Sequence, residues 1–152
     1  MPTAYRIVKA RHARTAFSGE GARLAGGRWN RPGEAVVCAS ASLALAAIET
    51  FVQLGEDALH IEFVHFRIEI PDGVGIQHCR RPPPGWRAEP PQESSMRYGS
   101  RWLQQGRTAV LEVPSAIVPS EVNYLLDPAH PDFRRIKVGR PLPFLFDPRM
   151  WK

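Results

Sequence analysis

One stretch of the chain carries the spacing of an amphipathic helix. In residues 42–54, apolar side chains recur at positions 43, 47, 48, 51 and 54, close to the 3.6-residue period of an α-helix. Ser40 or Ser42 is suited to cap the start of this helix, and Gly55 to end it. A rotation of about 100° per residue places Glu49 where the polar side meets the apolar side. The pattern predicts a helix that presents one carboxylate beside its apolar face.

Alternating apolar and polar positions predict strands elsewhere in the chain. The longest alternating run covers residues 60–70, and its apolar positions change phase near Val64 and His65. One extra residue in a strand produces such a change, so we expect a bulge there. Shorter strands are predicted at residues 5–8, 35–39, 108–118, 134–138 and 143–147. The third of these contains a proline, which limits its middle to a sheet edge or a bulge.

Two further segments complete the predicted layout. Residues 71–93 are rich in proline and glycine and are expected to form an irregular connection, and residues 95–106 a short helix that ends at Gly106. Strands with few helices and no regular alternation of the two favour an α+β fold with a mixed or antiparallel sheet. The length suits one domain, so residues 1–152 are expected to fold as a single unit.

The composition restricts the setting of the protein. No run of about 18 apolar residues occurs, and the first residues lack the apolar centre of a signal peptide, which predicts a cytoplasmic protein without membrane contact. Cys38 and Cys79 are expected to be free thiols in that compartment. No metal-ligand residues stand at a metal-binding spacing, so we predict no metal site.

The charge of the chain is positive, at +5 with a pI near 9.8, and most of its 20 basic residues are arginines. Such a balance suits an anionic ligand, an acidic partner or nucleic acid, and biased codon usage also explains it. A nucleic-acid-binding module is therefore one alternative. Against it, the arginines are scattered and the 42–54 helix has no basic face.

Residues 19–37 contain a glycine-rich stretch that matches neither common nucleotide loop. The stretch lacks the third glycine of the dinucleotide fingerprint, and it lacks the Gly-Lys-Ser/Thr of the phosphate loop. A glycine pair instead leads into Arg28 and Trp29. In one interpretation Arg28 binds a phosphate while Trp29 packs under it or against a ring. In the other, the stretch is an ordinary turn with a solvated arginine and a core tryptophan.

Several motifs together resemble one known family. The segments "GEGARLAGGRWNRPG", "AVVCAS", "SLALAAIET" and "AVLEVPSAIVPSEVNYLLDPAHPDF" follow one another as in the RES domain, the toxin half of certain bacterial toxin-antitoxin pairs. The three residues that give the family its name fall on Arg28, Glu49 and Ser115. The resemblance implies a fold similar to ADP-ribosyltransferases, with mixed or antiparallel sheets and flanking helices. It also implies NAD as the substrate with no separate cofactor, and growth arrest by NAD depletion or target modification.

The resemblance also assigns residue roles and a partner. Arg28, Glu49 and Ser115 are the expected catalytic residues. Arg28 is expected to bind the pyrophosphate or to position the nicotinamide ribose, Glu49 to hold the ribose hydroxyls, and the Ser115 hydroxyl to hydrogen-bond with the ribose or with Glu49. Trp29, Cys38 and Asn123 complete the expected binding residues. The expected partner is an Xre-type antitoxin with a helix-turn-helix domain. This antitoxin is expected to cover the active site and to bind DNA for the pair. A homo-oligomer within the complex is compatible with this expectation. Cys38 departs from the family, which commonly has a tyrosine there, and a thiol cannot stack on nicotinamide.

Bond chemistry is consistent with one catalytic carboxylate. Nicotinamide leaves NAD from a cationic ring nitrogen as a neutral molecule, so its departure needs no second acid, unlike that of an O-linked sugar. Glu49 is then expected to stabilise the developing oxocarbenium charge. Three functions remain open: transfer of ADP-ribose to water or phosphate, transfer to a protein, and partner binding by an inactive homologue.

Overall fold

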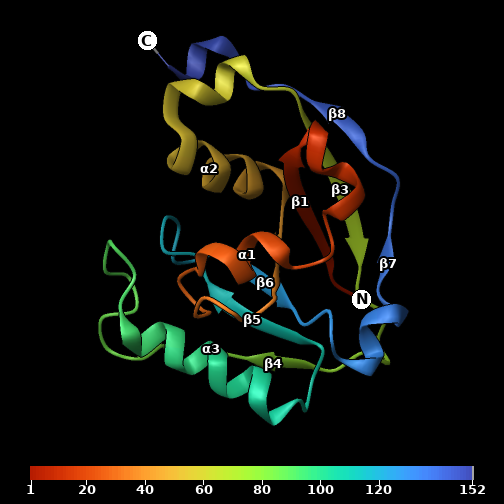
Figure 1. The fold of residues 1–152 in the computed structure, drawn as a ribbon, viewed down its shortest axis with the longest axis vertical. Helices are drawn as coiled ribbons and strands as arrows, with labels where there is room; N and C mark the ends of the chain where they lie inside the picture. Colours follow the sequence, from red (N-terminus) through yellow and green to blue (C-terminus); the bar gives the residue numbers. More distant parts are fainter. Residues whose placement is uncertain (152) are drawn as a thin grey trace.

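The computed structural model describes residues 1–151 as a curved sheet with helices at its ends and over its concave side (Figure 1). The strands are β1 (Thr3–Lys9), β2 (Val37–Ser40), β3 (Phe63–Glu69), β4 (Ile76–His78), β5 (Val110–Pro114), β6 (Val122–Leu126), β7 (Lys137–Val138) and β8 (Leu142–Phe144). The helices are α1 (Glu20–Ala25), α2 (Leu43–Leu54) and α3 (Glu93–Gln105). Short 3₁₀ helices cover Ala10–Thr15, Gly55–His60, Pro131–Arg135 and Pro148–Met150.

The eight strands form one mixed sheet, which confirms the predicted α+β class. Their order is β4-β5-β6-β2-β1-β3-β7, and β8 also pairs with β3. The β4–β5 pair is parallel, whereas the other pairs are antiparallel. Neighbouring antiparallel strands can be joined by a short turn, whereas parallel strands need a longer crossover that is usually a helix. A largely antiparallel sheet therefore does not require helices to alternate with strands.

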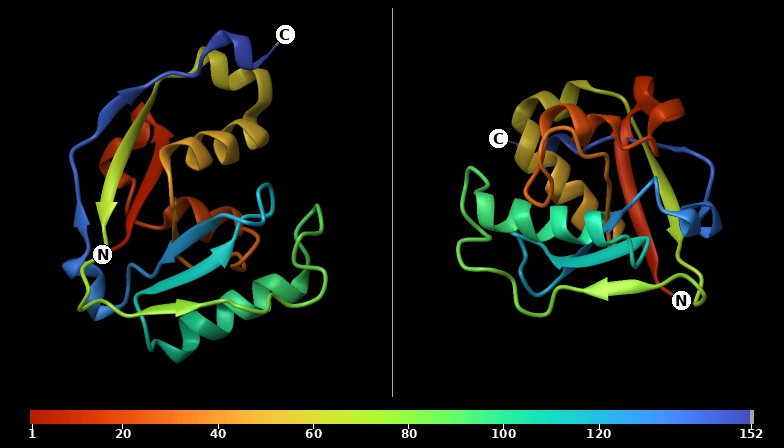
Figure 2. Two further views of the ribbon diagram at one scale, coloured as in Figure 1. Left: turned by 180° about the vertical axis from the view of Figure 1, so that it is seen from behind. Right: turned by 60° about the horizontal axis from the view of Figure 1, so that its bottom comes forward.

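The sheet narrows at its centre, where β1 meets β2 through a single residue pair, Tyr5 opposite Ser40. On either side the pairing is longer, because β1 follows β3 over its full length and β2 follows β6 over four pairs. Figure 2 shows β4, β5 and β6 lying across the direction of β1 and β3. The narrow joint allows the two halves of the sheet to turn relative to each other, and α2 lies beside this joint in contact with β1 and β2.

Three apolar clusters hold these layers together. One lies between the two halves of the sheet and includes Ala4, Val37, Ile68 and Leu126. A second joins α3 and the glycine-rich stretch to β5 and β6, and includes Trp29, Trp102, Leu111, Val113 and Leu125. The third packs α2 on β3 and on the chain end, and includes Ala58, Phe63 and Phe146. Each cluster buries apolar surface that would otherwise cost about 25 cal/mol per Å² in water.

The helix predicted at residues 42–54 is confirmed as α2. Ser42 caps it, because its Oγ accepts a hydrogen bond from the Leu45 backbone N–H at 3.0 Å. Gly55 follows its last residue with a φ of 60°, a value that favours glycine. The second predicted helix is also confirmed, since α3 ends at Gly106 as expected and begins two residues before the predicted start.

The bulge predicted in the 60–70 strand is wrong. Each residue of β3 pairs with one residue of β1 from Phe63 opposite Lys9 to Glu69 opposite Thr3, with no extra residue. The apolar positions change phase because one face of β3 is covered near its start and the other face near its end. Phe63 packs in the α2 cluster, whereas Ile68 packs in the cluster between the sheet halves. Residues before Phe63 belong to a 3₁₀ helix and its exit.

Other strand predictions need correction at their ends. The strand predicted to continue to residue 118 stops at Pro114, because the chain turns back after Ser115, whose N–H still donates to the Glu121 carbonyl of the returning segment at 2.9 Å. The strands predicted at 134–138 and 143–147 shorten to β7 and β8. Three elements escaped prediction, namely α1, β6 and the short β4 within the expected irregular connection. Strand β4 pairs along one edge only, with β5, and this contact depends on tertiary structure.

Three further observations bear on the setting of the chain. Within residues 1–151, no helix is long and apolar enough to cross a membrane. Both Cys38 and Cys79 are free thiols. In the same part of the chain, no three His, Cys, Asp or Glu side chains gather as ligands of a metal ion would.

Candidate active site

Glu49 on α2 is the centre of a hydrogen-bonded cluster. Its Oε1 accepts from the Ser115 hydroxyl at 2.7 Å and from the Asn123 amide Nδ2 at 2.9 Å. The three residues come from a helix, the end of β5 and the start of β6. Ser115 is fully buried, whereas Glu49 and Asn123 are partly exposed. The structure thus brings together three of the side chains that the sequence singled out.

The direction of the Ser115 hydrogen bond is fixed by its surroundings. The Ser115 Oγ accepts from the backbone N–H groups of Ile117 and Val118, each at 3.1 Å. These two bonds occupy the lone pairs of the hydroxyl oxygen, so its proton has to point to Glu49. The turn that ends the predicted 108–118 strand therefore orients the serine as a donor to the carboxylate.

Ser40 completes this group, and we call Glu49, Ser115, Asn123 and Ser40 the Glu49 cluster. The buried Ser40 hydroxyl donates to the Asn123 Oδ1 at 2.7 Å. This bond fixes which way the amide faces, because Oδ1 is held on β2 and Nδ2 is left to donate to Glu49. Sequence reasoning considered Ser40 only as a helix cap. Its position opposite Asn123 across the β2–β6 pair is known only from the sheet register.

The cluster leaves one carboxylate oxygen unused. Within residues 1–151, the hydrogen bonds of Glu49 all fall on Oε1, and both donors are uncharged. Uncharged donors fix the position of a carboxylate and leave its negative charge in place. Oε2 of Glu49 is therefore able to accept hydrogen bonds from a ligand or to face a positive charge.

Cys38 and Arg6 lie near this cluster. Desolvation by surrounding protein atoms raises the pKa of the Cys38 thiol; the charge of Arg6 lowers that pKa and the charge of Glu49 raises it. The Arg6 guanidinium donates to the backbone carbonyls of Cys38 and Ala16 at 2.8 and 2.7 Å. Sequence reasoning did not identify Arg6, because a single arginine in a strand carries no motif.

The structure gives Arg28 a different set of contacts. Its Nη1 donates to the carbonyls of Trp86 and Ala88 at 2.8 and 2.7 Å, and its Nη2 to the Glu89 carboxylate at 3.1 Å. Within residues 1–151, no hydrogen bond joins Arg28 to the Glu49 cluster. Arg28 instead ties the glycine-rich stretch to residues 86–89. The Glu89 side chain is 78% exposed, so its bond to Arg28 is open to exchange with another anion.

Trp29 belongs to the core. Its side chain is 6% exposed and packs against the rings of Trp86 and Tyr98, with centroids 6.2 and 5.8 Å away. Its position is that of the core tryptophan in the alternative interpretation, and contact between Trp29 and a substrate stays a prediction. Aromatic rings of this size contribute most when they are fully packed, which explains why the residue after Arg28 turns inward.

The rest of the glycine-rich stretch is fastened to α3. Arg31 pairs with Glu93 at the start of that helix, and the Glu34 carboxylate accepts from the Ser100 hydroxyl at 2.7 Å. A side chain at Gly99 would collide with the Trp29 carbonyl oxygen, so α3 and the stretch are in direct backbone contact. The glycines and arginines of this stretch thus build a loop that α3 supports.

The sequence of the chain was compared with known proteins. Residues 3–147 match the family described as the RES domain. The chain belongs to the RES domain family. This result confirms the resemblance on which the residue roles depend, and it covers the Glu49 cluster as well as the glycine-rich stretch.

Relatives of this RES domain are toxins by name. The chain is 47% identical over 138 residues to the "Prs ADP-ribosylating toxin" of Sphingobium sp. (strain YBL2), covering 88% of this chain and 86% of the relative. It is 38% identical to "Toxin Res" of Yersinia enterocolitica, covering 96% and 97% of the two chains. It is 37% identical to "Toxin Res" of Photorhabdus laumondii, covering 97% and 96%. The match extends along nearly the whole RES domain in each case.

Proposed function

We propose that this RES domain is a toxin that cleaves NAD at the bond between nicotinamide and ribose. The observation that carries the proposal is the state of Glu49, which is fixed through Oε1 by two uncharged donors and keeps Oε2 free. A carboxylate held in this way is prepared to stabilise positive charge without rearranging. The names of the RES relatives support the choice of toxin as the class.

The chemistry needs little more than this carboxylate. As the glycosidic bond breaks, positive charge develops on the ribose and nicotinamide leaves as a neutral molecule. Glu49 Oε2 accepts from a ribose hydroxyl and stabilises the oxocarbenium charge. Ser115 is a positioning residue and not a nucleophile, since its lone pairs accept two backbone N–H groups and its proton is directed to Glu49. Asn123 is placed to position Glu49 from the other strand.

Arg28 binds a phosphate of NAD in this proposal by exchanging its anion. The exposed Glu89 carboxylate accepts from Nη2 of Arg28. A pyrophosphate oxygen replaces Glu89 there, while the bonds to the Trp86 and Ala88 carbonyls keep the guanidinium in place. Cys38 is expected to line the nicotinamide end of the site, and no metal or separate cofactor takes part.

The acceptor of ADP-ribose is water or phosphate in the first form of the proposal. Either acceptor depletes NAD and arrests growth. A second form, transfer to a cellular protein, is favoured by the name of the Sphingobium relative, an ADP-ribosylating toxin. The two forms share the step at Glu49 and differ in what attacks the ribose carbon.

The partner proposed for this toxin is a cognate Xre-type antitoxin in the cytoplasm. Its helix-turn-helix domain binds DNA for the complex, and another part of the antitoxin covers the Glu49 cluster. A homo-oligomer within that complex fits the same scheme. The name "Toxin Res" of the Yersinia and Photorhabdus relatives supports the pairing with an antitoxin.

The decisive experiment measures nicotinamide released from NAD by the purified chain, with and without phosphate. Glu49→Gln keeps the shape of the side chain and removes its charge, and Glu56→Gln changes an exposed glutamate just beyond α2 as a matched control. We expect release by the wild type and the control, and a loss of at least about a hundredfold in Glu49→Gln. A phosphate requirement indicates phosphorolysis. Release that persists in Glu49→Gln contradicts the proposal.

A parallel incubation of cell extract with labelled NAD separates the two acceptors. Label on a protein that depends on Glu49, with little free ADP-ribose, indicates the transferase form. If neither assay detects a reaction, Cys38→Tyr tests the inactive-homologue alternative. A gain of activity in that variant shows that the missing ring limits the reaction, and continued inactivity leaves partner binding as the function.

A further inference from the structure

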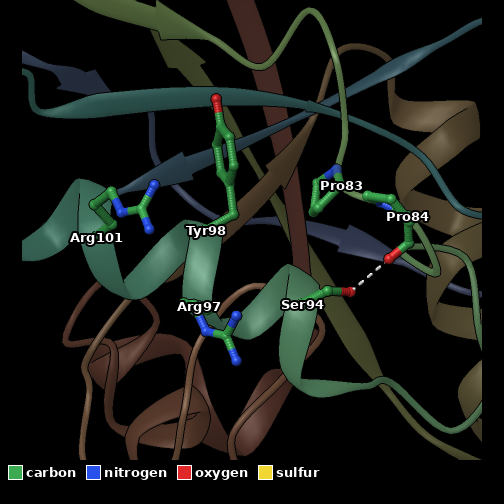
Figure 3. A pocket seen from close by; sticks show the side chains of 6 residues that line it. All are labelled: Pro83, Pro84, Ser94, Arg97, Tyr98 and Arg101. Atoms are coloured by element: carbon green, nitrogen blue, oxygen red, sulfur yellow. Dashed lines mark hydrogen bonds between the residues drawn. The ribbon is translucent and has the colours of Figure 1, made fainter.

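A hollow on α3 lies apart from the Glu49 cluster and takes no part in the proposed reaction. We call it the α3 hollow, and its volume is about 250 Å³. Figure 3 shows it between one side of α3 and the chain segment that faces this helix. Its lining residues are Pro83, Pro84, Ser94, Arg97, Tyr98 and Arg101.

The hollow is preformed by contacts on both of its sides. The Ser94 hydroxyl donates to the Pro84 carbonyl at 2.9 Å and joins the helix to the facing segment (Figure 3). Tyr98 packs edge-on against the buried Trp29 at 5.8 Å. The two prolines have restricted backbones and lose little freedom when a ligand binds. A partner would therefore meet walls that are already in place.

The walls and the rim differ in chemistry. The proline rings and the Tyr98 ring make the walls largely apolar, whereas Arg97 and Arg101 add two exposed guanidinium groups. Residues 97 and 101 are one helical turn apart, so their side chains leave α3 on the same side. An apolar depression bordered by two cations suits an apolar side chain that has negative charges beside it.

The charges on this side of the protein are not balanced internally. Neither Arg97 nor Arg101 forms an ion pair with a carboxylate within residues 1–151. Residues 76–107 contain six arginines and two glutamates. Both glutamates, Glu89 and Glu93, are already paired with Arg28 and Arg31 of the glycine-rich loop. The segment therefore keeps a local excess of positive charge around the hollow.

We propose that the α3 hollow is a docking site for an acidic segment of a partner protein. One apolar side chain of that segment enters between Tyr98 and the prolines, and flanking Asp or Glu side chains pair with Arg97 and Arg101. The planar guanidinium accommodates two carboxylate oxygens at once, which favours this pairing in arginine over lysine. The hollow favours a peptide over duplex nucleic acid, because a duplex keeps its bases stacked inside and presents mainly charged phosphates to the prolines.

This docking site goes beyond the proposed function. A partner bound there leaves the Glu49 cluster uncovered, because none of the cluster residues lines the hollow. The experiment therefore measures binding alone and gives the same answer whether or not the chain cleaves NAD.

The test measures fluorescence anisotropy of a labelled peptide, GEDLEDG, added to the full chain at low salt. The variant Arg97→Glu/Arg101→Glu reverses both rim charges. Arg134→Glu/Arg140→Glu is the matched control, because both of its residues are exposed, unpaired with carboxylates within residues 1–151, and outside the hollow. A second peptide, GEDSEDG, replaces the apolar centre with serine. A duplex DNA with the same label serves as the competing polyanion.

We expect the leucine peptide to bind with a Kd below about 1 mM and to weaken at least tenfold in the hollow variant and less than twofold in the control. The serine peptide should bind roughly fivefold more weakly than the leucine peptide, since leucine gains from burial. Absence of binding, equal loss in both variants or no preference for leucine overturns the proposal. DNA binding that depends on Arg97 and Arg101, with no peptide binding, assigns the surface to nucleic acid and also overturns it.

Discussion

Glu49 and Arg28 carry the two charges of the proposed RES site, and the fold holds them in opposite ways. Glu49 is fixed by uncharged donors that bond to one oxygen and leave the other free. Arg28 is fixed by two carbonyls and also paired with an exposed carboxylate. The negative charge of Glu49 therefore stays unpaired by these contacts, whereas the positive charge of Arg28 is paired with Glu89 unless another anion replaces that carboxylate.

The surroundings of the two residues explain this difference. Asn123 stands on β6 next to the narrow joint of the sheet, where the sheet register sets its position, and Ser115 directly follows β5 and is held by the N–H groups of Ile117 and Val118. The partners of Arg28 belong to an irregular segment, residues 86–89. A sheet fixes side chains more firmly than an irregular segment does, so we expect Glu49 to be rigid and the contacts of Arg28 to be exchangeable. The following predictions test this contrast in order of decreasing effect.

The strongest test removes the support of the Arg28 loop and leaves the Glu49 cluster alone. Gly99→Ala places a methyl group against the Trp29 carbonyl, which should lower the free energy of unfolding by about 3 kcal/mol or more in urea denaturation. Gly21→Ala is the control, because nothing lies within 4 Å of its new methyl group and alanine favours the helix. Equal stability of the two variants would show that α3 does not press on the loop.

The second test loosens Glu49. Ser115→Ala removes one donor to the carboxylate and leaves the N–H groups of Ile117 and Val118 without their acceptor, which should cost about 1–3 kcal/mol of stability. Nicotinamide release should fall at least about tenfold. Ser120→Ala, in the same loop but exposed, is expected to change neither quantity. An unchanged rate in Ser115→Ala would mean that Glu49 does not depend on the serine for its position.

The third test separates the two bonding modes of Arg28. Arg28→Lys cannot reproduce the planar fork and should weaken NAD binding roughly tenfold in calorimetry on the inactive Glu49→Gln background. Glu89→Gln removes the competing anion and should strengthen binding up to about fivefold. Weaker binding in Glu89→Gln would contradict the exchange of Glu89 for phosphate.

The fourth test concerns the orientation of the Asn123 amide. Ser40→Ala removes the donor to Asn123 Oδ1, so the amide is free to turn its oxygen toward Glu49. The kcat should fall roughly fivefold with little change in KM, and Ser40→Thr should restore it. A change in KM alone would place Ser40 in substrate contact and remove its positioning role.

The smallest effect is expected at the Arg31–Glu93 pair on the surface. The hydrogen bond from Arg31 lowers the pKa of Glu93, so the pair contributes stability above the unfolded pKa of a glutamate, about 4.3, and loses it as the pH falls through the lower folded value. The difference in stability between wild type and Arg31→Ala should therefore shrink below about pH 4. A difference that persists at pH 3 would indicate that packing, and not the charge of Glu93, connects Arg31 to α3.

Local sequence was sufficient for part of the fold. The helix at α2 followed from its apolar spacing, its serine cap and Gly55, all of which act within a few residues. Strand β1 was recognised in the same way. Strand β4 was missed because it depends on pairing with β5, and the false bulge in β3 arose because its two faces pack in different clusters. The alternation of apolar and polar residues does not reveal which face of a strand is covered at each position.

The candidate site shows the same division. Family motifs selected Glu49, Ser115 and Asn123, which the structure joins, and also Arg28 and Trp29, which it places elsewhere. Ser40 and Arg6 were not selected because each acts through partners distant in sequence. A side chain's hydrogen-bond partners depend on strand register, which a single sequence does not specify.

The sequence by itself determined the family, the main helix and the residues able to carry the chemistry. Tertiary structure alone decided that Glu49 keeps one oxygen free, that Arg28 is paired with Glu89, and that Trp29 lies in the core. The physical reason is the sequence separation between the groups that interact. Caps and helical spacing act over one turn of chain, whereas the bonds that set these states join residues roughly sixty to eighty positions apart, and only the folded sheet brings them within hydrogen-bond distance.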